Sequence, residues 1–147
     1  METIKTLRSI MTTDLRTVDL ETPVTEIQSI FKVYDFHHIP VLGIGGQLEG
    51  IISKEDLSKL TYYLSLITTG KTYSKLEYAS LKAKDIMTAQ PLCLDPDDHV
   101  GLAADIFLAN KFHALPIVDD GQLLGIVTTH DLMDHAYSSN FSDTVIF

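Results

Sequence analysis

The chain of 147 residues contains a single cysteine, Cys93, so it forms no internal disulfide and no metal site built from several cysteines. It also lacks any apolar stretch of the roughly 18 residues that a membrane-spanning helix needs. Residues 1–10 carry Glu2, Lys5 and Arg8 and have no apolar block of the kind found in secretory signals. These absences predict a cytoplasmic protein that does not insert into membranes.

Basic residues are scarce as well. The sequence has 11 lysines and arginines against 20 aspartates and glutamates, which gives a net charge of −9 at pH 7. A charge of this sign repels the phosphate backbone and removes the electrostatic attraction that dominates nucleic-acid affinity. It argues equally against binding to anionic membrane surfaces. The composition therefore excludes DNA and RNA as partners, while 45% apolar residues suffice for a sizeable globular core.

The chain does contain an internal repeat. Ile10-Met11-Thr12 recurs as Ile86-Met87-Thr88, and the residues that follow each tripeptide keep the same order of apolar, turn and polar positions. The shared polar positions gather at the edges of the apolar runs, whereas a repeat that served packing alone would not concentrate them there. Two copies therefore predict two related sites.

Each copy has the pattern strand, helix, strand, strand, helix. In the first copy, Thr22-Pro23 is expected to open a helix, with Thr22 as N-cap and Pro23 at the first helical position. In the second, Asp97 or Asp98 is expected to cap the corresponding helix. The predicted ranges are 15–20, 22–34, 39–42, 48–52 and 53–70 in the first copy, and 92–94, 98–108, 115–118, 123–127 and 128–137 in the second.

The two copies set the predicted domain boundaries. Residues 1–68 form a first module with its core at 10–67, residues 69–84 form a polar linker, and residues 85–147 form a second module with its core at 86–137. The second module ends in a tail whose last residues, 144–147, are β-prone. The sequence leaves open whether this tail extends a sheet edge or packs on a partner.

The most specific motif is the heptad 50–56, which recurs at 125–131. Each heptad starts with a glycine, runs from a strand into a helix, has a hydroxyl residue at the junction and places a carboxylate three positions later. The start of a helix suits a phosphate, the hydroxyl can donate to it, and the carboxylate can accept from the two hydroxyls of a ribose. The glycine lets a flat base approach the backbone. The residues concerned are Gly50, Ser53 and Asp56 in the first copy, and Gly125, Thr128 and Asp131 in the second.

The same heptad has a purely structural interpretation. A Ser or Thr at the N-cap with an acidic residue three positions later is a form of the capping box, which satisfies the free donors of a helix end. Local sequence favours capping, and the recurrence of the whole heptad favours a ligand site. Both interpretations remain open from the residues alone.

A second motif places a histidine just before each predicted strand, at His37 and His113. A histidine in this position can point into a cleft, and in its charged form it attracts phosphate. The alternative is a histidine packed against the rim of the core. His38 has no counterpart, because Ala114 takes its place in the second copy, and the two sites are therefore expected to differ.

Other candidate chemistry is weak. His99, His130 and His135 do not have the spacing of metal ligands relative to cysteine or carboxylate side chains. No nucleophile, base and oxyanion donor can be assembled from the sequence. We therefore expect neither a metal site nor an enzyme.

Taken together, these motifs resemble a tandem pair of CBS domains, the modules first named for cystathionine β-synthase. The resemblance rests on the two Ile-Met-Thr tripeptides, the apolar strands around Pro40 and Pro116, and the two heptads, and it covers nearly all of the chain. It implies an α/β (α+β) fold of two β-α-β-β-α modules that pack through their sheets around a pseudo-twofold axis and form two clefts. Many members of the family bind adenine nucleotides in such clefts and regulate an enzyme, channel or transporter.

The resemblance also implies a role for individual residues. The carboxylates would hold the ribose, the hydroxyl residues would face the phosphate, the strand starts would frame the base, and the histidines would line the phosphate side. The residues in these four groups are, in order, Asp56 and Asp131; Ser53 and Thr128; Thr17, Ile39, Cys93 and Leu115; and His37, His38 and His113. Members that bind nucleotides strongly often have an arginine beside the histidine, and this chain has none there.

The sequence therefore predicts a stand-alone regulatory module that binds an adenosine-containing ligand in the inter-module clefts and signals through a homodimer to an enzyme or transporter that the sequence does not identify. AMP is favoured over ATP, because Lys54 and Arg16 are the only cations near the motifs and would neutralise a triphosphate poorly. ADP and S-adenosylmethionine are further candidates, and no cofactor is required. The alternative is a ligand-free interaction scaffold in which the heptads only cap helices.

Overall fold

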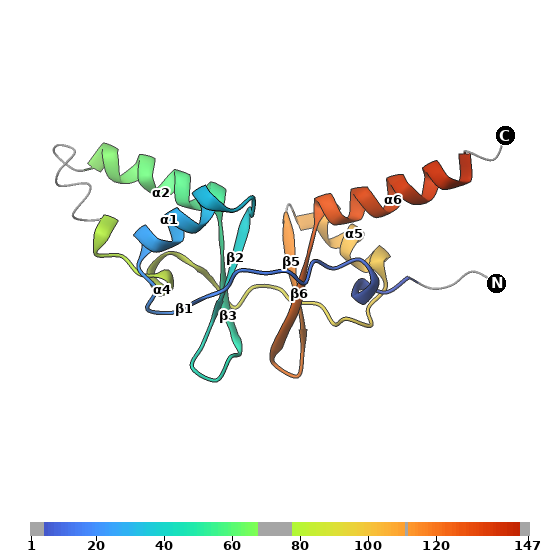
Figure 1. The fold of residues 1–147 in the computed structure, drawn as a ribbon, viewed down its shortest axis with the longest axis horizontal. Coiled ribbons are helices and arrows are strands. Elements are labelled where there is room, and N and C mark those ends of the chain that lie inside the picture. The colour runs from blue at the N-terminus through green and yellow to red at the C-terminus, as the bar shows by residue number, and fades with distance from the viewer. Residues whose placement is uncertain (1–4, 68–77, 111, 145–147) are drawn as a thin grey trace. The chain divides into compact units, whose positions relative to one another are not determined.

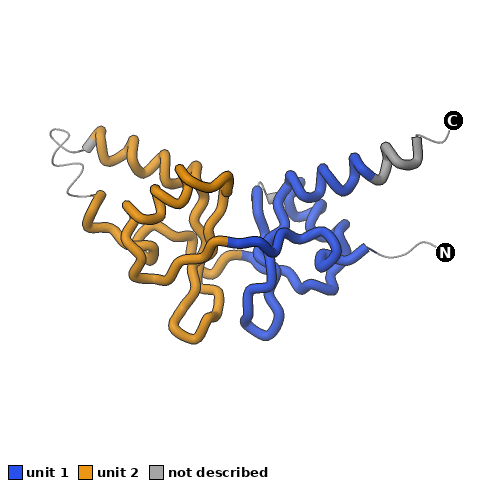
Figure 2. Tube along the Cα trace, viewed as in Figure 1, with its two compact units in different colours: residues 1–15, 92–147 blue, residues 16–91 orange. Residues whose placement is uncertain are grey.

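The computed structural model describes residues 5–67, 78–110 and 112–144 (Figure 1). The chain forms two compact units, which do not follow its linear order (Figure 2). Unit 1 consists of residues 1–15 and 92–147, and unit 2 consists of residues 16–91. The segment that begins the first repeat is therefore part of the unit built from the second repeat. Residues 68–77, which include much of the predicted linker, lie outside the described residues.

Unit 2 is built around a four-stranded sheet of order β1-β2-β3-β4. Strand β1 runs parallel to β2, and the other neighbouring strands are antiparallel. Helices α1 and α2 lie on one side of this sheet and contribute buried apolar side chains to its core (Figure 1). The elements are β1 (Val18–Asp19), α1 (Val24–Val33), β2 (His38–Leu42), β3 (Leu48–Ser53), α2 (Lys54–Ile67), α4 (Ala83–Ile86) and β4 (Thr88–Ala89).

Unit 1 has the same order of elements, but single β-bridges take the place of its two outer strands. Its hairpin β5-β6 is flanked by a parallel bridge between Leu94 and Ile117 and by an antiparallel bridge between Thr12 and Ile126. These bridges correspond to β1 and β4 of unit 2. The elements are η1 (Leu7–Ser9), α5 (Val100–Asn110), β5 (Ala114–Asp119), β6 (Gln122–Thr128) and α6 (Thr129–Thr144). The predicted α+β fold with two modules, each in the order strand, helix, strand, strand, helix, is thus confirmed.

The hairpin turns follow from their glycines. In unit 1, Asp119 pairs with Gln122, and the two residues between them, Asp120 and Gly121, have φ values of +51° and +79°. Positive φ at both central residues is the geometry of a two-residue hairpin turn whose twist matches that of the strands. In unit 2 a longer turn is closed by a hydrogen bond from the Gly43 N–H to the Gln47 carbonyl at 2.8 Å.

The expected cap of the first helix is wrong by one residue. Pro23, rather than Thr22, is the N-cap of α1, with φ of −62° and no side-chain capping bond. The Thr22 hydroxyl instead donates to the Asp19 carboxylate and accepts from the Asp19 N–H, both at 3.1 Å. Thr22 therefore closes the turn between β1 and α1, because its hydroxyl finds both partners in that turn.

The expected cap of α5 is also wrong. The Gly101 N–H in its first turn donates to Nδ1 of His99 at 2.9 Å. The Asp98 carboxylate accepts from the Asp95 N–H at 2.9 Å, and the Asp97 N–H donates to the Asp95 carboxylate at the same distance. The aspartates thus stabilise the turn before the helix, which leaves the helix end to His99.

The last helix is longer than predicted. α6 continues through the predicted tail to Thr144, since no proline or glycine after Tyr137 interrupts it. Thr144 is helical, so the β-prone interpretation is wrong at this residue, and residues 145–147 lie outside the described range. Within the described residues, no helix combines the length and the apolar character needed to cross a bilayer.

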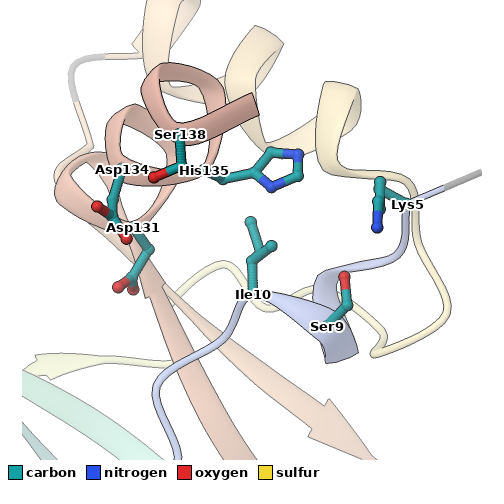
Figure 3. Close-up of a pocket in the computed structure, with 7 residues that line it drawn as sticks. All are labelled: Lys5, Ser9, Ile10, Asp131, Asp134, His135 and Ser138. Atoms are coloured by element: carbon teal, nitrogen blue, oxygen red, sulfur yellow. The ribbon is translucent and has the colours of Figure 1, made fainter. Parts of the chain in front are cut away.

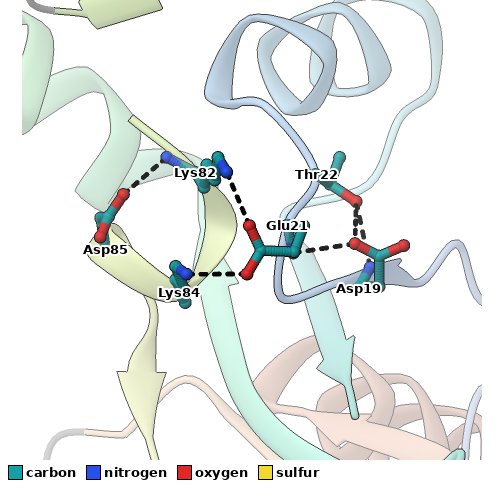
Figure 4. A network of polar contacts seen from close by, with 6 residues as sticks. All are labelled: Asp19, Glu21, Thr22, Lys82, Lys84 and Asp85. Carbon is teal, nitrogen blue, oxygen red and sulfur yellow. Dashed lines mark hydrogen bonds and ion pairs between the residues drawn. The ribbon is translucent and has the colours of Figure 1, made fainter. Parts of the chain in front are cut away.

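A cluster of ion pairs in unit 2 joins the segment before α1 to the start of α4 (Figure 4). The Glu21 carboxylate accepts from Lys82 Nζ and Lys84 Nζ, each at 2.7 Å. Beside it, the Ala83 N–H donates to the Thr22 carbonyl at 2.8 Å. The hydrogen bond from Lys82, followed by that from Lys84, lowers the pKa of Glu21 from 4.5 to about 2.

We expect Glu21→Gln to lower the stability of the protein at pH 7 and to have no effect at strongly acidic pH. Because the folded-state pKa lies below the unfolded value, the folded state binds fewer protons, so the stabilisation is complete above pH 4.5 and is lost as the pH falls toward 2. Urea midpoints measured across this range for both proteins check it. Asp35→Asn, at an exposed carboxylate, is the control. A Glu21→Gln effect that did not change with pH would contradict the prediction.

Candidate ligand site at the strand-to-helix junctions

The junction in unit 1 lies between β6 and α6. The Asp131 N–H donates to Thr128 Oγ1 at 3.1 Å, and the Thr128 N–H donates to Asp131 Oδ2 at 3.0 Å. This reciprocal pair is a complete capping box. The helix cap that the structural interpretation expects is therefore present at this junction, and the ligand role of the same residues stays a prediction. The Thr128 hydroxyl oxygen accepts in this arrangement, which leaves its hydrogen available for another acceptor.

The junction in unit 2 is only half closed. The Asp56 N–H donates to Ser53 Oγ at 3.0 Å, as in unit 1. Among residues 5–67, 78–110 and 112–144, however, no group donates to the Asp56 carboxylate, and the side chain is exposed. This carboxylate is therefore free to accept hydrogen bonds from a ligand.

The backbone brings the predicted histidines to the same junctions. The first N–H of α2, from Lys54, donates to the His37 carbonyl at 2.8 Å, and the first N–H of α6, from Thr129, donates to the His113 carbonyl at 3.2 Å. Both histidines are exposed, whereas His38 at the start of β2 is half-buried. The structure thus gathers a hydroxyl, a carboxylate and a histidine at each junction, although they are distant in sequence. Their role as ligand contacts stays a prediction.

The heptad glycines have a clear packing function. A Cβ on Gly50 would lie 2.5 Å from Met87 Sδ and 2.9 Å from the Thr88 carbonyl, and a Cβ on Gly125 would lie 2.9 Å from Met11 Sδ. Each glycine therefore admits the methionine of an Ile-Met-Thr tripeptide. Sequence reasoning connected these glycines with a ligand base, and that role remains a prediction beside the packing role.

The residues expected to frame a base lie at or just before the first residues of strands. Ile39 and Leu115 are fully buried. Val18 pairs with Val41 and Leu94 with Ile117, so Thr17 and Cys93 each precede a residue on a sheet edge. Thr17 is exposed, while Cys93 is half-buried and burial raises the pKa of its thiol. The role of these four residues in framing a base stays a prediction.

The sequence motifs did not identify Thr12 as a neighbour of the candidate site. Its hydroxyl donates to both oxygens of the Asp131 carboxylate, at 3.1 Å to Oδ1 and 3.2 Å to Oδ2. The recurrence of Thr in the two Ile-Met-Thr tripeptides was the signal available in the sequence. It did not identify the partner, because the contact joins residues 119 positions apart.

A hollow of about 350 Å³ lies beside Asp131 in unit 1 (Figure 3). Lys5 and His135 both line it, and His135 projects from α6 toward the side formed by Lys5 and Ile10. Its volume falls in the range of small-molecule pockets. The lining residues are Lys5, Ser9, Ile10, Asp131, Asp134, His135 and Ser138. No three His, Cys, Asp or Glu side chains in the described part of the chain gather as a metal ion requires.

Comparison with known proteins identifies the family. The sequence profile of the CBS domain matches residues 7–62 and 83–138. The chain belongs to the CBS domain family and contains two copies of the domain.

Individual relatives are similar over most of this chain. An uncharacterised protein of Methanocaldococcus jannaschii is 32% identical, with 74% of this chain and 78% of that protein covered. Inosine-5′-monophosphate dehydrogenase of the same organism is 27% identical over 90% of this chain, which spans only 24% of the dehydrogenase. The crystal structure of CBSX2 of Arabidopsis thaliana in complex with AMP has a TM-score of 0.76 and 28% identity, with 92% of this chain and 98% of that chain covered.

We expect Gly50→Ala and Gly125→Ala each to destabilise the protein by about 1–3 kcal/mol, the usual cost of overpacking. The added methyl group would overlap a methionine and a backbone carbonyl. Urea denaturation measures the change. Adding Met87→Ala to Gly50→Ala is expected to recover only part of the loss, because the Thr88 carbonyl stays in place. Wild-type stability of both glycine variants would contradict the packing role.

The two heptad aspartates are expected to differ in their contribution to stability. Asp131→Ala removes a complete capping box and is expected to lower the free energy of unfolding by about 0.5–2 kcal/mol. Asp56→Ala is expected to cost less, because its carboxylate accepts no hydrogen bond from the described residues. Chemical denaturation of the two variants side by side provides the test. Equal losses would show that both carboxylates act as caps.

Proposed function

We propose that this protein is a regulatory module that binds an adenosine-containing ligand at its two strand-to-helix junctions. The observation that carries the proposal is the open carboxylate of Asp56, which lies next to the Ser53 hydroxyl at the start of α2. A carboxylate that accepts no hydrogen bond from the described residues at a helix start is ready for the two hydroxyls of a ribose. The AMP complex of the similar CBSX2 supports the choice of ligand.

The proposed contacts follow from the hydrogen bonds at each junction. The hydroxyls of Ser53 and Thr128 accept a backbone N–H, so each can donate its hydrogen to a phosphate oxygen. The N-termini of α2 and α6 add a positive electrostatic potential there. In this proposal the histidines lie beside the phosphate, and the residues at the strand starts lie beside the base. The histidines are His37, His38 and His113, and the residues at the strand starts are Thr17, Ile39, Cys93 and Leu115.

The distribution of positive charge favours a monophosphate. Lys54 follows Ser53 directly in the first junction, and Thr129 holds the equivalent place in the second. Arg16 is packed 4.2 Å over the ring of Tyr34, which also accepts a hydrogen bond from it. With few cations and a net charge of −9, the protein is poorly suited to a triphosphate. We therefore place AMP ahead of ADP, ATP and S-adenosylmethionine.

Regulation through a homodimer is the second part of the proposal. Tyr62, Tyr63 and Leu66 of α2 are 67%, 59% and 64% exposed, and Met133 and Tyr137 of α6 are 70% and 67% exposed. Exposed apolar side chains on two long helices favour burial against a second copy. Ligand binding would then shift the dimer between arrangements by no more than the difference in its affinity for them. The regulated partner would be an enzyme or transporter, and the module itself is not proposed to catalyse a reaction.

A ligand-free scaffold is the second candidate function. The complete capping box of Thr128 and Asp131 favours it, because that carboxylate already has a structural purpose. Under this alternative the paired modules supply only an interaction surface. The open carboxylate of Asp56 is what the scaffold does not explain.

Titration calorimetry with AMP, ADP, ATP and S-adenosylmethionine tests the proposal. We expect AMP to bind most tightly and Asp56→Asn to weaken it at least tenfold, because the amide replaces one acceptor oxygen of the ribose contact with a donor. Asp105→Asn on the exposed side of α5 serves as the matched control and should bind as the wild type does. If none of the four ligands binds at millimolar concentration, the scaffold replaces the regulatory module. Light scattering reports the expected dimer in the same samples.

A further inference from the structure

The two heptad carboxylates differ in how much of their acceptor capacity is used. An ionised carboxylate offers about four acceptor positions. Asp131 accepts from the Thr128 N–H at 3.0 Å and from the Thr12 hydroxyl at 3.1 and 3.2 Å. Asp56 accepts no hydrogen bond from the residues that the structure describes. A ribose brings two neighbouring hydroxyls, so Asp56 has room for both, whereas at Asp131 they compete with the Thr128 N–H and the Thr12 hydroxyl for the same oxygens.

Thr12 is held in place by the backbone. Its N–H donates to the Ile126 carbonyl at 2.8 Å, and the Ile126 N–H donates back to the Thr12 carbonyl at 3.0 Å. Met11, the preceding residue, occupies the space above Gly125. The strand pairing therefore holds the Thr12 backbone against β6, and from this position its hydroxyl reaches the Asp131 carboxylate.

The counterpart in unit 2 does not make this contact. Thr88 belongs to β4 and pairs with Ile51, as Thr12 pairs with Ile126. Its side chain is exposed, and in the described ranges it has no hydrogen bond to Asp56. The threonine of the tripeptide thus donates a hydrogen bond to the heptad carboxylate in unit 1, whereas its counterpart in unit 2 does not.

We infer that Thr12 is a specificity-determining residue that weakens ligand binding at the unit 1 junction, so that an adenosine monophosphate fills unit 2 first. This inference rests on the proposed function. The Thr12 hydroxyl shares one hydrogen between two oxygens, at distances beyond the usual 2.5–3.0 Å of an O–H···O bond, so a ribose can displace it. The displacement lowers the affinity of unit 1 about tenfold, the low end for hydrogen bonds to a charged group.

The consequence is a graded response. A small rise in ligand concentration fills only the Asp56 junction, and a further rise of about tenfold fills the Asp131 junction as well. The second step also displaces the Thr12 hydroxyl from Asp131 while the backbone pairing of Thr12 with Ile126 stays in place. The two junctions would then report different concentrations of one ligand.

AMP titration of the full chain, followed by calorimetry and by NMR, tests the inference. We expect two binding steps about tenfold apart, with Asp56→Asn removing the tighter one and Asp131→Asn removing the weaker one. In the Asp56→Asn background, Thr12→Val should raise the remaining affinity about tenfold, since valine keeps the shape and removes the hydroxyl. Thr88→Val is the matched control and should leave both steps unchanged. Thr12→Ser keeps a hydroxyl and should behave as the wild type does.

The outcomes separate the inference from the proposed function. If AMP binds but Asp131→Asn removes the tighter step, or if Thr12→Val and Thr88→Val act alike, the inference is wrong and the proposed function stands. If AMP binds to no variant, both are wrong. Should Thr12→Val fail to fold, as judged by circular dichroism, the comparison of Asp56→Asn with Asp131→Asn still decides which junction binds first.

Discussion

The close contact between a methionine and a glycine determines how each unit is assembled. Met87 packs against Gly50, and Met11 packs against Gly125, at distances that leave no room for a Cβ. In each pair the methionine comes from the start of one repeat and the glycine from the heptad of the other. The chain can make both contacts only if the repeats exchange their first segments, and this exchange produces unit 1 from residues 1–15 and 92–147.

The exchange brings a residue of the first repeat to the candidate site in unit 1. The tripeptide that closes the sheet edge also brings a threonine to the junction, so the Asp131 carboxylate meets a residue 119 positions away. A change in the N-terminal segment therefore acts directly on a site formed by the second repeat. A scaffold that needed only helix caps would not require this contact, because the reciprocal bonds of Thr128 and Asp131 already satisfy the helix end.

The repeats are equal in topology and unequal in chemistry. Both sheets have the same strand order, and both helix starts donate their first N–H to a histidine carbonyl. They differ at His38 and Ala114, and in the engagement of Asp56 and Asp131. Duplication of a fold preserves the hydrogen bonds that build it, whereas side chains at the edge of a site are free to diverge. The asymmetry is therefore found in the carboxylate contacts rather than in the backbone.

Local pattern was enough to predict the paired strands, the helices between them and the two strand-to-helix junctions, because alternation, helical spacing and turn residues act over a few positions. The caps at Thr22 and Asp98 were predicted wrongly, since each side chain had a competing partner in the turn before the helix. The sequence by itself determined that there are two α+β modules and which residues end each strand. Only the tertiary structure decided that the modules exchange segments and that the Thr12 hydroxyl donates to the Asp131 carboxylate. Both features join residues that are distant in sequence, and no local pattern encodes their proximity.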